Sequence, residues 1–473
     1  MRLGELADID SDSDVTGFAL DHRKVARGSV FGAFRGSTVN GEDFIADAVD
    51  RGAAAVVASS EAVVPKVPHL ADPVPRRRFA ELAARFYAPY PETVVAVTGT
   101  NGKTSTVEMT RQIWRMIGHR SASIGTLGVT TSDDQVKTGL TTPDIVTFLN
   151  NMAGLERMGI SHVAYEASSH GLDQHRCEGV DLAAAAFTNF SRDHLDYHPT
   201  MDAYFEAKMR LFDELLEPGR SAVIWTDDAK SDEVIERCRA RGHEAITVGR
   251  RGETIRLASQ EPSALGQTLQ ITHDGKDYRL ALPLIGAYQA ANVLTAAALI
   301  LATGGKWADV FSAMQRVAPV RGRLERAVIS RAGVPVYVDY AHTPDALEAA
   351  IAALRPHVSE RGRLITVFGA GGDRDEGKRP EMGRVATALS DIVIVTDDNP
   401  RTEEPAAIRS AIMTEAPGAI EVAGRREAIA EALKLARSGD IVLLAGKGHE
   451  TGQIVGDRVL PFDDALVARE CAA

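Results

Sequence analysis

The chain is poor in the residues that mark several protein classes. Among 473 residues only three are cysteines, Cys177, Cys238 and Cys471, and they lie far apart without metal-ligand spacing. Scattered cysteines favour reduced thiols in a cytoplasmic protein over a disulfide framework. Basic residues are also in deficit, 53 against 65 acidic ones, which gives a net charge of −12. Because nucleic-acid-binding proteins usually present a basic face, we expect no nucleic-acid partner, and local clusters must bind any anionic substrate.

Long apolar runs are missing as well. Residues 1–10 contain no apolar core of signal-peptide length, and the most apolar run, residues 293–302, is too short to span a bilayer. We therefore expect neither a secretion signal nor a membrane span. Charged residues make up 25% of the chain and hydrophobic ones 44%, which is typical of a folded globular protein, and the length predicts about three domains.

One stretch predicts nucleotide binding. Residues 94–97 are apolar and predict a strand buried on both faces, after which Gly99 and Gly102 allow the backbone to turn tightly around a ligand. A helical pattern begins after Thr104. Strand, glycine loop and helix N-terminus together make a phosphate cradle, in which Lys103 would reach the terminal phosphates and Thr104 would ligate magnesium.

This phosphate loop is a shortened variant, because Val97 stands where the usual motif has a further glycine. A Gly-Lys-Thr tripeptide is common by chance, but one between a buried strand and an amphipathic helix is not. The ATP-binding residues that we predict here are Gly99, Thr100, Asn101, Gly102, Lys103, Thr104 and Ser105.

Residues 1–87 predict a small α/β module. Strands are expected at 30–34 and 53–58, and a helix at 43–50. The loop at 35–41 is of the kind that contacts ligands, although such a loop by itself is more often merely a connection.

Beyond the phosphate loop, strands alternate with helices, which implies a parallel sheet. Strands are predicted at 162–167, 183–188 and 221–226, and helices at 144–158 and 200–212. Ligands bind beyond the carboxyl ends of such strands. The edge of the phosphate loop should therefore gather the polar residues Glu166, Ser168, Ser169, His170, Asn189, Asp193 and His194. A lone Glu or His is more often structural, but several at successive strand ends favour a site.

Two further segments complete the central region. Lys208, judged by pattern alone, is a solvated residue of the helix at 200–212. Residues 255–285 switch to a β pattern with a hairpin turn at Asp274–Gly275, and an alanine-rich helix then ends near Gly304.

The last third of the chain is a second alternating region. Its predicted strands are 335–339, 364–368, 392–396, 420–423 and 441–445, and its predicted helices are 344–354, 380–389, 405–415 and 425–436. The loops after the strands are rich in polar residues, at 340–344, 369–375, 397–401 and 446–450. Four polar loops on one edge predict a second binding face, whereas the glycine run in the second loop is by itself only a weak dinucleotide signal.

Five motifs, in order along the whole chain, resemble those of the Mur ligases of bacterial peptidoglycan synthesis: Gly99–Thr104, Glu166–His170, Asn189–His194, Gly286–Asn292 and Asp339–Pro344. The resemblance implies an α/β protein of three domains. These are a small N-terminal uridine-nucleotide domain (1–87), a central P-loop ATPase domain with a parallel sheet (88–320) and a C-terminal Rossmann-like domain that binds an amino acid (321–473).

The resemblance also implies a reaction in the bacterial cytoplasm. ATP phosphorylates the D-glutamyl γ-carboxylate of UDP-N-acetylmuramoyl-L-alanyl-D-glutamate, an amine attacks the acyl phosphate, and a tetrahedral intermediate collapses to an amide. Asp398–Arg401 resembles the signature of family members that add meso-diaminopimelate, whereas lysine-adding relatives have a different residue in place of Arg401. We expect a monomer that acts on these small-molecule substrates.

By the same resemblance, the catalytic residues are Lys103, Glu166, His194 and Lys208. Thr104 and Glu166 would bind one Mg²⁺. His194 would help to bind a second Mg²⁺ with Lys208, which carbon dioxide would convert to a carbamate, an anionic oxygen ligand suited to a hard cation.

The resemblance assigns the remaining contacts to the substrates. Asn292 would meet the adenine, and Arg323 and Asp339 would complete the nucleotide site. The UDP substrate would contact Leu20, His22, Ser37, Thr38, Val39, Asn40, Thr141, Thr142, Ser168, Gln174 and Arg176. The chain departs from the family pattern at His22, where many relatives have serine, and at Ser37-Thr38, which replace a more usual His-Gln.

Diaminopimelate would contact Arg374, Asp398, Asn399, Pro400, Arg401, Gly446 and Glu450. Arg401 can bind the distal carboxylate in a fork-like pair, and Glu450 can meet the distal ammonium. Because lysine lacks that carboxylate, a buried and unpaired Arg401 would penalise lysine and so set the selectivity.

Three alternatives compete with this interpretation. A folate polyglutamate synthase shares the phosphate loop and the acyl-phosphate chemistry but would lack the N-terminal module and Asp398–Arg401. A P-loop kinase would give a phosphorylated product without an added amino acid, and the polar C-terminal loops argue against it. A non-catalytic nucleotide-binding scaffold is disfavoured by the presence of Lys103, Glu166, His194 and Lys208.

Overall fold

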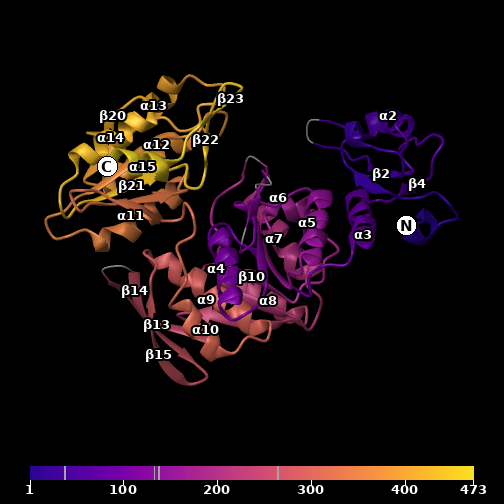
Figure 1. The fold of residues 1–473 in the computed structure, drawn as a ribbon, viewed down its shortest axis with the longest axis horizontal. Coiled ribbons are helices and arrows are strands. Elements are labelled where there is room, and N and C mark those ends of the chain that lie inside the picture. The colour runs from indigo at the N-terminus through magenta and orange to yellow at the C-terminus, as the bar shows by residue number, and fades with distance from the viewer. Residues whose placement is uncertain (37–38, 133, 137–138, 196, 264–265, 473) are drawn as a thin grey trace. The chain divides into compact units, whose positions relative to one another are not determined.

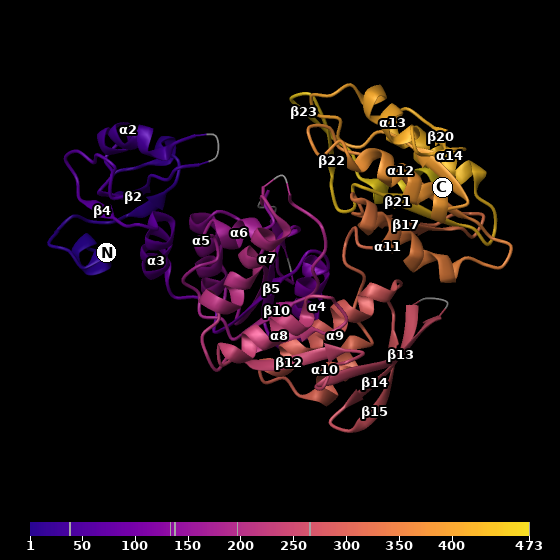
Figure 2. The ribbon, with the colours of Figure 1, turned by 180° about the vertical axis from the view of Figure 1, so that it is seen from behind.

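The computed structural model describes residues 1–36, 39–132, 134–136, 139–195, 197–263 and 266–472. The chain divides into two compact units, which Figures 1 and 2 show from opposite sides. The first unit contains Met1–Thr247 and Thr295–Trp307, and the second contains Val248–Leu294 and Ala308–Ala473. Among the helices of the described ranges, none is both long and apolar enough to cross a membrane.

The first unit begins with a four-stranded parallel sheet in the order β1-β2-β3-β4. Its strands are β1 (Gly17–Ala19), β2 (Ser29–Gly32), β3 (Ala55–Ala58) and β4 (His69–Ala71). The helical segments are α1 (Leu3–Ala7), the 3-10 turns η1 (His22–Lys24) and η2 (Gly41–Phe44), α2 (Ile45–Asp50) and α3 (Pro75–Tyr87). The two strands and the helix predicted in this region are confirmed to within a few residues.

A second sheet of the first unit is built around β5 (Thr93–Thr98), which lies between β9 (His162–Glu166) and β10 (Ala184–Phe187) and is parallel to both. The residues at 94–97 are all completely buried, as predicted for a strand covered on both faces. Val97 pairs with Glu166 and Thr98 with Phe187. The carboxyl ends of the three strands are therefore level, so the residues that follow them meet at one edge.

The other elements of this sheet region follow the predicted alternation only in part, because three consecutive strands after the phosphate loop form an antiparallel run. The strands are β6 (Ser121–Gly125), β7 (Gly128–Thr130), β8 (Gln135–Val136), β11 (Ser221–Trp225) and β12 (Glu244–Gly249). The helices are α4 (Lys103–Met116), α5 (Ile145–Arg157), α6 (Ser169–Asp173), α7 (Met201–Arg210), a π turn η3 (Leu211–Leu215) and α8 (Ser231–Ala240).

The second unit starts with an antiparallel meander of β13 (Ile255–Ser263), β14 (Gly266–His273) and β15 (Lys276–Leu282). Asp274 and Gly275 connect β14 to β15 with φ of +48° and +71°, which confirms the predicted hairpin turn. The predicted alanine-rich helix is α9 (Ala287–Ala302), and α10 (Trp307–Met314) follows it.

The remainder of the second unit is a six-stranded sheet in the order β16-β17-β21-β18-β19-β20. Only β16 is antiparallel to its neighbour among these described pairings. The strands are β16 (Glu325–Ile329), β17 (Pro335–Asp339), β18 (Leu364–Phe368), β19 (Ile392–Val395), β20 (Ile420–Glu421) and β21 (Ile441–Ala445). The helical segments are α11 (Pro344–Leu354), η4 (Arg355–His357), α12 (Lys378–Leu389), α13 (Pro405–Met413), α14 (Arg425–Leu435) and α15 (Asp464–Ala472).

Every strand and helix predicted for the last third is present. Not predicted were β16, α15 and the hairpin of β22 (Gly452–Val455) and β23 (Arg458–Pro461). The α/β class and the largely parallel pairing are confirmed, whereas the domain boundaries at 87/88 and 320/321 stay predictions.

Candidate active site

The phosphate loop joins β5 to α4 in a backbone conformation that requires glycine. Gly99 has a φ of +140° and Gly102 a φ of +85°. A Cβ added to Gly99 would lie 2.0 Å from Thr188 Oγ1, so no larger residue fits. Because Gly102 directly precedes α4, the partial positive charge of the helix N-terminus lies at the loop. This arrangement suits a phosphate group.

Two lysine ammonium groups contact one carbonyl of this loop. Gly99 O accepts hydrogen bonds from Lys103 Nζ at 2.9 Å and from Lys208 Nζ at 2.7 Å, and Lys103 Nζ also donates to Thr100 O at 2.7 Å. Burial, and secondly the neighbouring charge of Lys103, hold the pKa of Lys208 well below its ordinary value. The site therefore favours the neutral form of Lys208 more than water does.

The pattern-based expectation that Lys208 is solvated is wrong, because the side chain is only 1% exposed. Its ammonium also lies 4.3 Å from the centroid of the Tyr204 ring. Tyr204 and Lys208 are four residues apart and therefore share one face of α7, and that face packs under the phosphate loop. The spacing of four residues between Lys208 and the large aromatic Tyr204 was the signal in the sequence that Lys208 is buried.

Glu166 ends β9 and lies beside the first turn of α4. Its Oε2 accepts a hydrogen bond from Thr104 Oγ1 at 3.1 Å, and its Oε1 accepts one from Thr126 N at 2.7 Å. Thr126 Oγ1 adds a third bond at 3.2 Å. The structure thus brings Glu166 and Thr104 together as predicted. Thr126 was not predicted, although its position one residue beyond β6 was a signal.

His194 lies in an aromatic cluster near the same edge. Its backbone has a φ of +54°, which is uncommon for a residue with a side chain. Its ring centroid is 4.8 Å from that of His170 and 5.9 Å from that of Tyr204. The contacts described for the Lys208 ammonium are with Gly99 O and the Tyr204 ring, so the predicted pairing of His194 with Lys208 stays a prediction.

The donors at this edge fit magnesium better than a softer metal. In the part of the chain that the structure describes, no three His, Cys, Asp or Glu side chains form a metal-binding group. A magnesium ion in a nucleotide site usually takes one or two protein oxygens and completes its octahedron with phosphate oxygens and water. The Thr104 hydroxyl and the Glu166 carboxylate, 3.1 Å apart, supply such a pair.

Asn189 closes the phosphate loop from the end of β10. Its backbone O accepts from Thr100 N at 2.9 Å and its Oδ1 accepts from Asn101 N at 2.8 Å. Its Nδ2 donates to Asn101 O at 3.0 Å. Three bonds from one residue hold the loop, which confirms that Asn189 belongs to this edge. Ser105, the last predicted residue of the ATP-binding stretch, is buried in the first turn of α4.

The candidates for the peptide part of the UDP substrate form one network with Glu166. Thr142 Oγ1 donates to Glu166 O at 2.8 Å and lies 2.9 Å from Ser168 Oγ. Arg176 donates to Thr142 O at 3.2 Å and to Gln174 Oε1 at 2.5 Å. Thr141 lies beside the Thr126 hydroxyl, at 3.1 Å, and so joins the same network.

The candidates for the uridine end lie in the first 87 residues. Leu20 is half-buried directly after β1, and the His22 ring stacks on Phe44 with a centroid distance of 4.4 Å. Asn40 caps η2 by accepting from Glu42 N, and Val39 is exposed. Ser37 and Thr38 lie outside the described residues.

Of the nucleotide candidates of the second unit, Arg323 lies near the buried carboxylate of Asp339. Asp339 accepts from Leu324 N at 2.7 Å and from Ala341 N at 2.9 Å. Burial raises the pKa of Asp339 above its ordinary value, and the charge of Arg323 opposes that shift. The Arg323 guanidinium lies 4.9 Å from the Tyr340 ring centroid. Asn292, on α9, is buried and donates to Gln289 Oε1 at 3.1 Å.

The four polar loops of the second unit do converge on one edge. Gly446 N donates to Asp339 O at 3.1 Å at the end of β17, and the Tyr340 and His449 ring centroids lie 5.0 Å apart, which joins the loops after β17 and β21. Gly372 N donates to Asn399 O at 2.9 Å, which joins the loops after β18 and β19. Asn399 Nδ2 donates to Glu450 Oε2 at 2.8 Å, which connects the two halves. The predicted second binding face therefore has a built framework of side-chain and backbone bonds.

Arg401 is held in this edge by an element that was not predicted. Its backbone has a φ of +53°, its N donates to Ile454 O at 3.0 Å, and its O accepts from Gly456 N at 2.6 Å. These bonds tie it to the β22–β23 hairpin. Its guanidinium donates to Gly372 O at 2.7 Å and is only partly buried, so further donors remain for a carboxylate.

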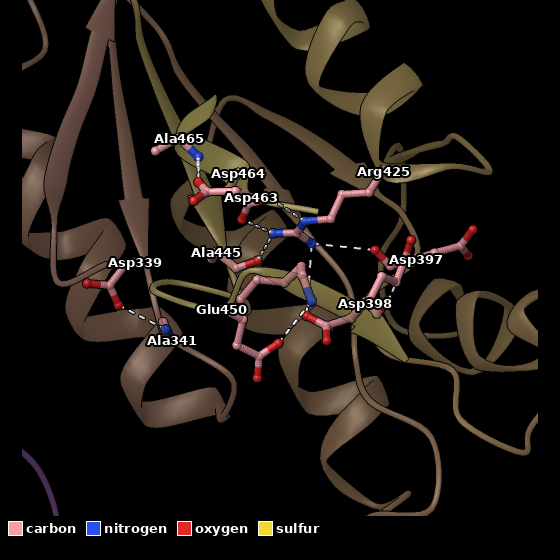
Figure 3. Close-up of polar contacts among 12 residues, drawn as sticks. Asp339, Ala341, Asp397, Asp398, Arg425, Ala445, Glu450, Asp463, Asp464 and Ala465 are labelled. Atoms are coloured by element: carbon pink, nitrogen blue, oxygen red, sulfur yellow. Dashed lines mark hydrogen bonds and ion pairs between the residues drawn. The ribbon is translucent and has the colours of Figure 1, made fainter. Parts of the chain in front are cut away.

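A buried ion pair lies behind this edge (Figure 3). Arg425, at the start of α14, contacts Asp464, at the start of α15, at 2.7 and 2.6 Å, and both side chains are 0% exposed. Arg425 also donates to Ala445 O at 2.8 Å and lies 3.9 Å from Asp398 Oδ2. The pair thus holds the end of β21 and places a positive charge near the carboxylate of Asp398. Neither Arg425 nor Asp464 was predicted.

Three remaining candidates differ in their placement. Pro400 is buried between Asn399 and Arg401. Gly446 has a φ of +112°, and a Cβ there would lie 2.5 Å from Asp398 Oδ2, so glycine is required. Arg374 is exposed, and its guanidinium donates to Asp373 O at 3.3 Å.

Known protein families match this chain along most of its length. The Mur ligase family, catalytic domain, matches residues 14–87, the Mur ligase middle domain matches 97–300, and the Mur ligase, glutamate ligase domain matches 322–448. Over 465 residues the chain is 56% identical to a UDP-N-acetylmuramoyl-L-alanyl-D-glutamate--2,6-diaminopimelate ligase of Zymomonas mobilis subsp. mobilis, which covers 98% of this chain and 95% of the relative. A ligase of the same name from Bradyrhizobium diazoefficiens is 50% identical, with coverages of 95% and 93%.

Solved structures extend the comparison. A structure of a ligase with this same name superposes with a TM-score of 0.74 at 33% identity, covering 100% of this chain and 98% of the other. A Mycobacterium tuberculosis folylpolyglutamate synthase complexed with ADP and AMPPCP has a TM-score of 0.65 at 20% identity over 79% of this chain and 92% of its own, which shows a shared fold alone. The identity over nearly the whole chain and the three successive domain matches show that this protein belongs to the Mur ligase family.

Proposed function

We propose that this chain is an ATP-dependent ligase that joins meso-diaminopimelate to the D-glutamyl γ-carboxylate of UDP-N-acetylmuramoyl-L-alanyl-D-glutamate in peptidoglycan precursor synthesis. The observation that carries the choice of amino acid is the polar edge of the second unit. There Arg401 and Glu450, a cation and an anion, are attached to one framework through Gly372 and Asn399. A substrate with a distal carboxylate and a distal ammonium matches this pair of charges.

The phosphate-loop edge suits the first half of the reaction. A carboxylate resists attack by an amine until one of its oxygens becomes a leaving group, and phosphorylation by ATP supplies that group. Two magnesium ions, when bound, would neutralise the charge of the transferring phosphoryl group. Lys103 would contact the terminal phosphates in place of the carbonyls of Gly99 and Thr100. Thr104 and Glu166 would hold one magnesium ion, and His194 would contribute to the second.

We propose that Lys208 is carbamylated. Only a neutral amine has the lone pair that attacks carbon dioxide: the N–C bond forms, one C=O bond becomes C–O⁻, and one proton leaves. Burial and the charge of Lys103 lower the pKa of Lys208, which favours this neutral amine. The resulting anion would attract Lys103, whereas the unmodified neutral amine offers it no charge.

Selectivity in this scheme depends on Arg401. Diaminopimelate gives the partly buried guanidinium of Arg401 a carboxylate partner, whereas L-lysine does not. We also expect the enzyme to be a monomer and to act in the cytoplasm. Light scattering of the purified protein would test whether it is a monomer.

The experiment measures ATP-dependent phosphate release with UDP-N-acetylmuramoyl-L-alanyl-D-glutamate and either meso-diaminopimelate or L-lysine. We expect turnover with diaminopimelate only, together with the UDP-tripeptide product by mass spectrometry. Turnover with lysine would support the ligase activity but contradict the proposal that Arg401 selects diaminopimelate. A phosphorylated product without an added amino acid would indicate a kinase, and release with neither amino acid would reject the proposal.

A further inference from the structure

Lys447 is a fully buried cation within the polar edge of the second unit. It directly follows Gly446 after β21, and its side chain is 0% exposed. Its Nζ lies 3.0 Å from Asn399 Oδ1 and 2.9 Å from Glu450 Oε2. The ammonium therefore contacts two of the residues that we assign to the amino-acid substrate, but its burial keeps it away from solvent.

Lys447, together with the backbone N–H of Ile454, determines which way the Asn399 amide faces. Asn399 Oδ1 accepts from Lys447 Nζ and from Ile454 N, the latter at 3.0 Å. A lysine ammonium can only donate, so the oxygen of the amide must lie on its side. The amide nitrogen is then directed to Glu450 Oε2, where it donates at 2.8 Å.

Lys447 also fixes the Glu450 carboxylate. Oε2 receives two donors, from Lys447 and from Asn399, whereas among the described residues Oε1 receives none. The Glu450 side chain is 29% exposed, so one oxygen is held from inside and the other is accessible. The second oxygen, Oε1, is therefore the one available to a cationic ligand group.

We propose that Lys447 is a positioning residue for the amino-acid substrate: it holds Glu450 Oε2 and the Asn399 amide so that Glu450 Oε1 receives the distal ammonium. This inference rests on the proposed function and refines its second binding face. Lys447 itself does not touch the substrate. Without it the carboxylate could rotate among several conformers, and binding would have to restrict that freedom.

The test replaces Lys447 with Met, which keeps the length of the side chain but removes its charge and donors. Because Glu450 retains access to water, its charge is not left stranded and the variant should fold. We expect the KM for meso-diaminopimelate to rise about ten- to a hundredfold, which is the effect of losing a hydrogen bond to a charged group. The KM values for ATP and the UDP substrate, and kcat at saturating diaminopimelate, should stay within about twofold of the parent values. Lys447→Arg keeps a cationic donor and should recover part of the loss.

The matched control is Lys434→Met on α14 of the same unit, whose side chain is 76% exposed and which should change none of these constants. An unchanged or lower KM for diaminopimelate in Lys447→Met would overturn the inference while leaving the proposed function intact. An equal rise in all three KM values would also overturn it, because it would indicate general loosening. If circular dichroism shows that Lys447→Met is unfolded, Lys447→Arg becomes the test. Its donors are displaced relative to those of lysine, so only the KM for diaminopimelate should rise. Kinetic constants equal to those of the parent would reject the inference. Absence of any turnover by the parent would instead reject the proposed function.

Discussion

The two polar edges of this protein owe their shapes to different groups: one to the backbone and the other to side chains. At the phosphate loop, the shape comes from backbone: two glycines with positive φ, a helix N-terminus, and carbonyls that bind Lys103 and Lys208. At the edge of the second unit, the shape comes from side chains, above all the Lys447–Asn399–Glu450 network and the Arg425–Asp464 pair behind it.

This difference matches the chemistry proposed for each edge. A phosphate is a simple anion that backbone N–H groups bind without regard to the rest of the molecule. A particular amino acid must be distinguished from similar ones, which requires charged groups at defined positions. The first edge should therefore be sensitive to the loss of glycine, and the second to the loss of single charges.

The largest effect is expected from the buried ion pair. Asp464→Asn removes the nearer of the two carboxylates that face Arg425, in a site that is 0% exposed, and leaves only Asp398 at 3.9 Å, which should destabilise the second unit by about 3 to 5 kcal/mol. Chemical denaturation, with hydrogen exchange of α14 and α15, measures the change. Glu431→Gln, which breaks an exposed pair with Lys434 on α14, should cost no more than about 0.5 kcal/mol. Equal effects of the two variants would contradict the comparison.

The backbone edge is tested by Gly99→Ala. The added Cβ would meet Thr188 Oγ1 at 2.0 Å, and φ would stay in the left-handed region, so the loop must change its shape. We expect ATP to bind about a hundredfold more weakly by calorimetry, about 2.7 kcal/mol. Gly118→Ala is the control, because its φ of +99° imposes similar strain while its Cβ would meet nothing within 4 Å. ATP affinity that is preserved in Gly99→Ala would show that the loop tolerates a side chain.

The side-chain edge is tested by Arg401→Asn, chosen because asparagine tolerates the φ of +53° at this position. Loss of the guanidinium should lower kcat/KM for meso-diaminopimelate about ten- to a hundredfold. The kcat/KM for L-lysine should not fall, so the ratio of the two kcat/KM values should become smaller. Arg426→Asn removes an exposed guanidinium of α14 and serves as the control. A parallel loss for both amino acids would mean that Arg401 supports the fold and does not select the substrate.

The smallest effect is an acid response limited to the first unit. His162, at the start of β9, has a pKa lowered from 6.5 to about 4 by burial and then by the charge of His119. Since the unfolded chain binds this proton more readily, protonation opposes folding: the contribution to stability is present above pH 6.5 and is lost as the pH falls toward 4. Because His119 is exposed and water screens its charge, we expect about 1 to 2 kcal/mol.

His162→Gln should remove this part of the acid response. Hydrogen exchange of β9 at pH 7 and pH 4.5, compared between the parent and the variant, isolates it from the carboxylates that titrate in the same range. An identical pH dependence in both proteins would exclude His162 as its source.

The sequence by itself determined the α/β class, the alternation of elements and the two edges. The relevant patterns are local: the apolar stretch at 94–97, the glycines of the phosphate loop and the period of strands and helices. Such patterns can be interpreted without knowledge of distant contacts. Because the carboxyl ends of parallel strands share one edge, order along the chain was enough to group Glu166 with Thr104, and Asn399 with Glu450.

Only the tertiary structure decided which charges are buried and what they contact. Lys208 has the sequence of a solvated helix residue, and its burial depends on α7 packing under a loop about a hundred residues earlier. The residues of each buried pair are distant in the chain: Arg425 and Asp464 lie 39 residues apart, and Lys447 and Asn399 lie 48 residues apart. The hairpin that holds Arg401 is short and exposed, so it has little hydrophobic pattern to reveal it. Such contacts are set by long-range packing, which a one-dimensional pattern does not contain.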